Sequence, residues 1–185
     1  MHFRTDVTID RPREEVFHRL ADELGTTIPL ICPLTISVTL DTDKLIGVGV
    51  TGQMMIKNVF TTAKVDFEVS RYEKDERLSL EVRYRRRSSQ TDYRFRDEGT
   101  GTTVAMVTDA PAVGPGWVQG WNERVLKRHE RGDAHRLKAL LEGRGGEPAL
   151  AVVRRNRRRS FALSVVIGGI LAVSLFLIRI WLGGV

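Results

Sequence analysis

Residues 7–17 have the sequence VTIDRPREEVF, and the spacing of the apolar side chains changes within this stretch. From residue 3 to residue 10, polar and less polar side chains alternate, which is typical of a strand with one buried face. Asp10 is a good helix N-cap, and Pro12 suits a first helical turn. From Val16 onward the apolar residues recur at helical spacing. We therefore predict a strand that passes directly into a helix.

The sequence between residues 35 and 108 alternates apolar and polar side chains in six segments. The segments cover residues 35–40, 46–54, 59–70, 78–84, 91–95 and 104–108. Short polar turns separate them, and each segment has one polar and one apolar face. This pattern predicts an antiparallel meander with one face in water and the other in the core.

A helical period returns in residues 117–142, after Pro111 and Pro115. The middle of this predicted long helix is highly polar. A glycine-rich stretch at residues 143–146 then ends the helix. Residues 1–143 are long enough to form one domain with its own core, and a single cysteine, Cys32, leaves no internal disulfide to expect.

The order of strand, helix, meander and long helix resembles the START-like, helix-grip superfamily. This superfamily is also called SRPBCC and includes polyketide cyclase/dehydrase-like proteins. The resemblance spans residues 1–143 and is carried by residues 7–17, by DEGTGTTV at residues 97–104 and by LKALLE at residues 137–142. It implies an α+β helix-grip fold, in which a curved antiparallel sheet of about seven strands grips a long C-terminal helix. It also implies an apolar cavity between the sheet and the helix.

Inward apolar and aromatic side chains of the meander and the long helix would line this cavity. The candidate ligand-binding residues are Val59, Phe67, Leu80, Tyr93, Phe95, Met106, Trp117 and Trp121. In a small domain, an inward aromatic residue more often belongs to the core. Thr61, Thr91 and Thr108 are polar inward positions that would either orient a ligand or satisfy backbone groups.

The sequence shows no constellation typical of catalysis or metal binding. His18, His129 and His135 lie among charged residues of predicted helices, and we expect them to be exposed. The spacing of His, Cys, Asp and Glu does not match a zinc site, and a phosphate-binding loop signature is absent. We therefore expect no catalytic residues, no metal and no cofactor.

A basic segment followed by an apolar stretch predicts a membrane anchor. Five arginines, Arg154, Arg155, Arg157, Arg158 and Arg159, precede an uncharged run over residues 161–178. About 18 apolar residues suffice to cross a bilayer as a helix. We expect a basic linker at residues 144–160 and a transmembrane helix at residues 161–183. Because basic residues stay on the cytoplasmic side, the arginines would orient a single-pass cell-membrane protein with its N-terminal domain in the cytoplasm.

Charge distribution argues against nucleic-acid binding. The chain has 29 basic and 23 acidic residues, but six of the arginines lie after residue 150 and no acid does. Residues 1–150 therefore carry no net charge, whereas a polyanion-binding domain should carry its positive charge on its folded surface. Arg83, Arg85, Arg94 and Arg96 are predicted on the outward face of two strands, either as solvated residues or as contacts for lipid headgroups or an acidic partner.

These observations favour a membrane-tethered binding protein for a hydrophobic ligand, such as a lipid, an isoprenoid or a polyketide-like compound. Two alternatives remain open. One is a cyclase or dehydratase acting on such a ligand, which requires an inward ionisable group beside the cavity. The other is a ligand-free, membrane-anchored interaction module. Ser164, Gly168 and Ala172, four residues apart, permit a homodimer through the transmembrane helix.

Overall fold

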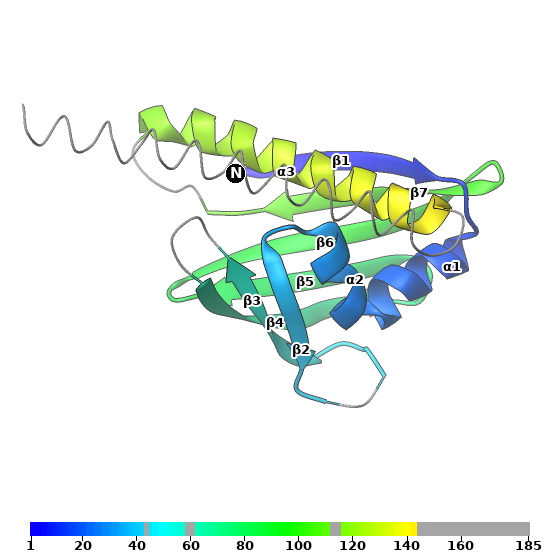
Figure 1. Ribbon diagram of the computed structural model, residues 1–185, viewed down its shortest axis with the longest axis horizontal. Coiled ribbons are helices and arrows are strands. Elements are labelled where there is room, and N and C mark those ends of the chain that lie inside the picture. Colours follow the sequence, from blue (N-terminus) through cyan, green and yellow to red (C-terminus); the bar gives the residue numbers. More distant parts are fainter. Residues whose placement is uncertain (43–44, 58–61, 112–115, 144–185) are drawn as a thin grey trace, which may run out of the picture.

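Figure 1 shows the computed structural model, which describes residues 1–42, 45–57, 62–111 and 116–143 of the chain. For residues 116–118, 121 and 122 it describes the backbone and not the side chain. The predicted basic linker and transmembrane helix, residues 144–160 and 161–183, lie outside the described residues. Within the described residues, no helix is both long enough and apolar enough to cross a bilayer.

Seven strands form one antiparallel sheet with the order β1-β7-β6-β5-β4-β3-β2. The elements in chain order are β1 (His2–Ile9), α1 (Arg13–Phe17), the helical turn η1 (His18–Asp22), α2 (Leu24–Ile31), β2 (Thr35–Leu40), β3 (Thr51–Lys57), β4 (Thr62–Glu73), β5 (Arg77–Tyr84), β6 (Arg87–Glu98), β7 (Gly101–Asp109) and α3 (Gly116–Glu142). The predicted α+β helix-grip fold is confirmed for this part of the chain.

The helices cover one face of the sheet from its two edges. α3 packs against β1 at one edge, whereas α2 packs against β2 at the other and touches α3 between them. Figure 1 shows α3 lying along the β1–β7 side, with α1 and α2 below it. The concave face of the sheet therefore turns toward α3 and α2, and the inward side chains of the strands lie on this face.

Phe17 links the first helix to the sheet. Its ring packs edge-on against Phe95 of β6 and Tyr72 of β4, with ring centroids 5.1 and 5.3 Å apart. Phe17 is almost fully buried, together with Leu20 and Val16 of the same helical segment. The strand-to-helix stretch that begins the chain therefore inserts its apolar stripe directly into the core.

Residues at the turn between β6 and β7 contact the segment that joins β1 to α1. The Thr102 hydroxyl donates a hydrogen bond to the Arg11 carbonyl at 2.8 Å, and the Arg11 amide donates to the Ile9 carbonyl at 2.9 Å. A Cβ atom at Gly101 would lie 2.5 Å from the Ile9 carbonyl oxygen, so this position requires glycine. The two segments that carry the family resemblance at residues 7–17 and 97–104 are thus in direct contact.

The structure corrects the sequence analysis at the start of β3. The alternation at residues 46–50 predicts that a strand begins there, but β3 begins at Thr51 and Val48 is 68% exposed. The apolar alternation belongs to a loop in which Gly49 has a positive φ of 82°. Leu45 in the same loop is 90% exposed.

Two of the predicted outward arginines, Arg83 and Arg94, lie apart on the sheet. β5 and β6 are neighbours, but the register pairs Arg83 with Ser88 and Arg94 with Arg77, far apart along the strands. Both Arg83 and Arg94 form ion pairs with carboxylates beside them. Local acids therefore neutralise these two arginines.

The close contact between Gly101 of β7 and Ile9 of β1 predicts that Gly101→Ala destabilises the domain. Because the added Cβ atom would overlap the Ile9 carbonyl, we expect the free energy of unfolding to fall by about 1–3 kcal/mol. Gly25→Ala in α2 is the control, since its Cβ would lie an ordinary 3.8 Å from the Val38 carbonyl oxygen of β2. That change should stabilise by about 1 kcal/mol. Urea unfolding of both variants measures the change in the free energy of unfolding. Equal changes in the two variants would show that the close contact at Gly101 does not matter.

Candidate functional site

Burial along β5 decreases steadily toward the β5–β6 hairpin. The inward residues Leu78 and Leu80 are buried, Val82 is half-buried and Tyr84 is 42% exposed. The concave face of the sheet is therefore closed at one end of this strand and open at the other.

The neighbouring strands show the same gradient. On β6, Phe95 and Tyr93 are buried but Thr91 is half-buried, and on β7 the buried Met106 is followed by the half-buried Thr108. The register pairs Thr91 with Thr108, so both positions lie at the same level of the sheet. The open end of the concave face is thus the end that carries the β5–β6 hairpin.

The long helix α3 closes the sheet only over its second half. Ala134, Leu137 and Leu141 are buried at helical spacing and belong to the core. Among the α3 side chains that the structure describes, none before Glu130 is buried; Val125 is half-buried and Leu126 is 36% exposed. The first half of α3 therefore lies over the open end of the concave face without sealing it.

The candidate ligand-binding residues from the sequence occupy two regions. Phe67, Leu80, Tyr93, Phe95 and Met106 are all buried members of the core beneath the helices. Val59 lies outside the described residues, and the side chains of Trp117 and Trp121 do so too. The backbone places Trp117 and Trp121 in the first turns of α3, above the open end. Their role in ligand binding stays a prediction.

A buried carboxylate marks the boundary between the two halves of α3. Glu130 accepts hydrogen bonds from the hydroxyls of Thr108 of β7 at 2.6 Å and Thr5 of β1 at 3.0 Å. Thr91 lies 3.3 Å from Thr108, and because Thr108 donates its proton to Glu130, Thr91 must donate to Thr108. Burial raises the pKa of Glu130, although the two hydroxyls oppose this shift.

A second polar group lies one turn further along α3. Arg136 forms an ion pair with Asp133 and donates a hydrogen bond to the Ile31 carbonyl at the end of α2. Burial raises the pKa of Asp133, while Arg136 and a hydrogen bond from the Cys32 thiol lower it. The group therefore joins α3 to α2 and keeps an ionisable carboxyl under the helix.

Tyr93 and Cys32 add weakly acidic protons to this region. Burial is the main cause that raises the pKa of both groups, and the nearby Asp133 carboxylate raises both further. Burial thus favours the protonated, neutral forms of the Tyr93 hydroxyl and the Cys32 thiol. The thiol proton is already donated to Asp133.

Sequence reasoning missed these polar groups because it treated the middle of the helix as a solvated charged segment. A signal was present. Glu130, Ala134, Leu137 and Leu141 recur at intervals of four, three and four residues, so Glu130 continues the apolar stripe toward the sheet. Its position in that stripe, rather than its charge, indicates which face it occupies.

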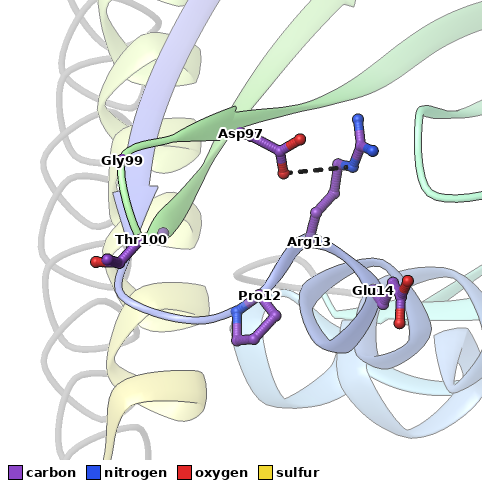
Figure 2. Close-up of a pocket in the computed structure, with 7 residues that line it drawn as sticks. Pro12, Arg13, Glu14, Asp97, Gly99 and Thr100 are labelled. Carbon is purple, nitrogen blue, oxygen red and sulfur yellow. Dashed lines mark ion pairs between the residues drawn. The ribbon is translucent and has the colours of Figure 1, made fainter.

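A separate hollow lies at the closed end of the domain, between the start of α1 and the β6–β7 turn (Figure 2). Its volume is about 390 Å³, and it is lined by Pro12, Arg13, Glu14, Asp97, Gly99, Thr100 and Gly101. Arg13 Nε lies 3.5 Å from Asp97 Oδ1 across it. The side chains in this hollow are mostly polar, and its charged pair is already formed, so it does not suit an apolar ligand.

The described part of the chain contains no cluster of three or more His, Cys, Asp and Glu side chains arranged to hold a metal ion. Of the three histidines expected to be exposed, His18 and His135 are, whereas His129 is half-buried on α3. Burial, aided by Arg136 and Arg128, lowers the pKa of His129, so its neutral form is favoured.

A curved antiparallel sheet gripping a long C-terminal helix, open beside the first half of that helix, defines the helix-grip class of proteins. The chain belongs to the family described as polyketide cyclase / dehydrase and lipid transport, whose sequence model matches residues 1–142. No curated protein matches the chain.

Solved structures with this fold are similar over most of the chain. Protein TTHA0849 from Thermus thermophilus is 18% identical, with a TM-score of 0.59, and the match covers 82% of this chain and 99% of TTHA0849. Protein DR_A0006 from Deinococcus radiodurans is 19% identical, with a TM-score of 0.56, covering 77% and 98%. Ara h 8.0201 is 12% identical, with a TM-score of 0.53, covering 74% and 97%. At these identities the likeness shows the fold.

Glu130→Gln is predicted to change how stability depends on pH. The raised pKa of Glu130 means that its contribution is fully present below its ordinary value near 4.5 and is lost as the pH rises through the folded-state pKa. The glutamine variant lacks this loss, so its melting temperature relative to the parent should rise from pH 4 to pH 8. Thermal unfolding followed by circular dichroism at several pH values measures this. A difference independent of pH would show that Glu130 is not buried as described.

Proposed function

We propose that the domain binds a hydrophobic ligand between the concave face of the sheet and the first half of α3. Membership of a family described by polyketide cyclases, dehydrases and lipid transport supports a hydrophobic small molecule or lipid as the ligand. The observation that carries the proposal is the burial gradient, because apolar side chains lead from the closed core to an end that α3 does not seal.

The polar groups under α3 suit a ligand with a polar end. An apolar body would contact side chains such as Val82 and Tyr93, and hydrophobic burial would supply most of the affinity. A hydroxyl or carbonyl group on the ligand would reach the level of Thr91 and Thr108, where Glu130 already accepts hydrogen bonds. A small number of polar groups in an apolar site fix the orientation of the ligand, and they contribute less to its affinity.

A cyclase or dehydratase is the second candidate, and one observation favours it. Such an enzyme needs ionisable groups facing the ligand, and Glu130, Asp133 and Tyr93 face inward with raised pKa values. A carboxyl whose pKa lies nearer neutrality can exchange protons with a substrate more readily. Each of these carboxylates also has a structural partner, so binding without chemistry remains the leading proposal.

The binding proposal predicts that a bulky side chain at the open end blocks the ligand. In a fragment of residues 1–145, which contains every described element, Val82→Trp should weaken binding of the neutral fluorescent probe N-phenylnaphthylamine by about tenfold or more. Arg96→Trp is the control, because Arg96 is exposed on the outward face of β6. Fluorescence titration gives both affinities, with circular dichroism to check folding.

Two results would contradict the binding proposal. The first is a parent fragment that neither binds the probe nor retains a lipid in native mass spectrometry. The second is equal loss of binding in the Val82 and Arg96 variants, which would place the probe outside the concave face.

We also propose that residues 161–183 tether the domain to the cytoplasmic face of the cell membrane. The support is the sequence alone, in which five arginines over residues 154–159 precede the uncharged run at residues 161–178. A linker of about 17 residues would hold the domain within some tens of Å of the bilayer and so raise its effective concentration toward membrane ligands.

Tethering predicts that the full chain stays with membranes after washing with carbonate at high pH, which removes peripheral proteins. A chain ending at residue 145 should be released. Recovery of the full chain in the soluble fraction would contradict the tether. So would protease access to the C-terminus exclusively from inside intact cells.

A further inference from the structure

The outward face of α3 carries a row of three arginines, Arg124, Arg128 and Arg131, here called the arginine row. Successive members are four and three residues apart, so their side chains project from one face of the helix. All three are exposed. At about 1.5 Å of rise per residue, the row is ~10 Å long.

The two central acids of α3 point away from the arginine row. Glu130 accepts hydrogen bonds from Thr5 and Thr108 on the sheet, and Asp133 pairs with Arg136 on the buried side. The helix therefore places its central carboxylates inward and its arginines outward.

The acids near the two ends of α3 are engaged with lysines. Glu123 Oε1 lies 2.6 Å from Lys127 Nζ, and Glu142 Oε1 lies 3.1 Å from Lys138 Nζ. Within the described residues, no carboxylate forms an ion pair with a member of the arginine row. The row is thus an uncompensated positive surface on a domain whose residues 1–150 carry no net charge.

We propose that the arginine row lies against an anionic bilayer surface. At the same helical spacing the row is flanked by Gly120 and His135, both exposed, and is preceded by Trp121 and Trp117, three and seven residues before Arg124. Tryptophan beside basic residues is typical of a surface at the membrane–water interface. A flat row of guanidinium groups suits lipid phosphates, which it can bind through paired hydrogen bonds. The basic segment at residues 154–159 lies close behind α3 in the sequence and has the same charge.

Contact through the arginine row would place the open end of the domain beside the bilayer. Arg124 and Arg128 belong to the part of α3 that lies over the open end of the concave face and does not seal it, and Arg131 follows Glu130 directly. A hydrophobic ligand leaving the bilayer would then reach the site with little passage through water. This consequence rests on the proposed ligand binding, whereas the contact with lipid does not.

The test compares the reactivity of individual arginines toward phenylglyoxal in the full chain. The chain is added to nanodiscs of neutral phosphatidylcholine or of the same lipid containing phosphatidylglycerol, and modification is measured for each arginine by mass spectrometry. The arginine row should react several times more slowly with the anionic discs, and added salt should reverse the effect because it screens surface charge. Arg4, Arg71 and Arg96, which are exposed on strands β1, β4 and β6, are the internal control and should not change.

A matched pair of variants separates position from net charge. Arg124→Gln, Arg128→Gln and Arg131→Gln together should slow association of the full chain with anionic vesicles by about fivefold or more, as expected for lost electrostatic steering. Arg4→Gln, Arg71→Gln and Arg96→Gln remove the same charge and should have a smaller effect.

Equal reactivity of the arginine row in both lipids would overturn the proposal. Protection of Arg4, Arg71 and Arg96 in place of the row would also do so, as would equal slowing by both triple variants. Failure of the tether gives a different result in vesicle flotation. The full chain would then not float with neutral vesicles, but it would still bind anionic vesicles through the arginine row. Failure of ligand binding leaves all of these measurements unchanged.

Discussion

The buried carboxylate of Glu130 divides α3 into two parts with different surroundings. Beyond it, Ala134, Leu137 and Leu141 pack into the core and hold the helix on the sheet. Before it, no described side chain of the helix is buried. The hydroxyls of Thr5 and Thr108 donate hydrogen bonds to Glu130, whose carboxylate would otherwise be costly to bury. The apolar contact of α3 with the sheet can therefore end at Glu130 without leaving a buried charge unpaired.

This division explains how one helix can grip seven strands and still leave one end open. The closed end is fixed by apolar packing around Phe17 and by the contact of Gly101 and Thr102 with the segment from Ile9 to Arg11. Arg136 adds a polar connection from α3 to the end of α2. These contacts therefore gather at one end, and the proposed ligand site lies at the other end, beside the first half of α3.

The sequence was sufficient to predict the fold, because strands and helices have different hydrophobic periods and the segments at residues 7–17 and 97–104 have a specific local geometry. It failed at Val48, where alternation continues into a loop, since periodicity does not distinguish an exposed loop from a short strand. The local sequence signal was the glycine at position 49, which adopts a positive φ in the loop before β3.

Prediction of the site was less complete. Periodicity placed Phe67, Leu80 and Met106 on the inward face, and they are buried there, but burial alone does not separate a ligand contact from the core. The inward carboxylates escaped notice because charge was given more weight than helical spacing. The difference between the two halves of α3 depends on how the sheet curves beneath it, which local sequence does not specify.

The most direct test is a crystal structure of residues 1–145 purified without removal of lipid. We predict elongated electron density between the first half of α3 and the concave face, with a polar atom near the level of Thr91 and Thr108. A structure in which the first half of α3 packs tightly onto β5 and β6, leaving no space and no density, would contradict this prediction.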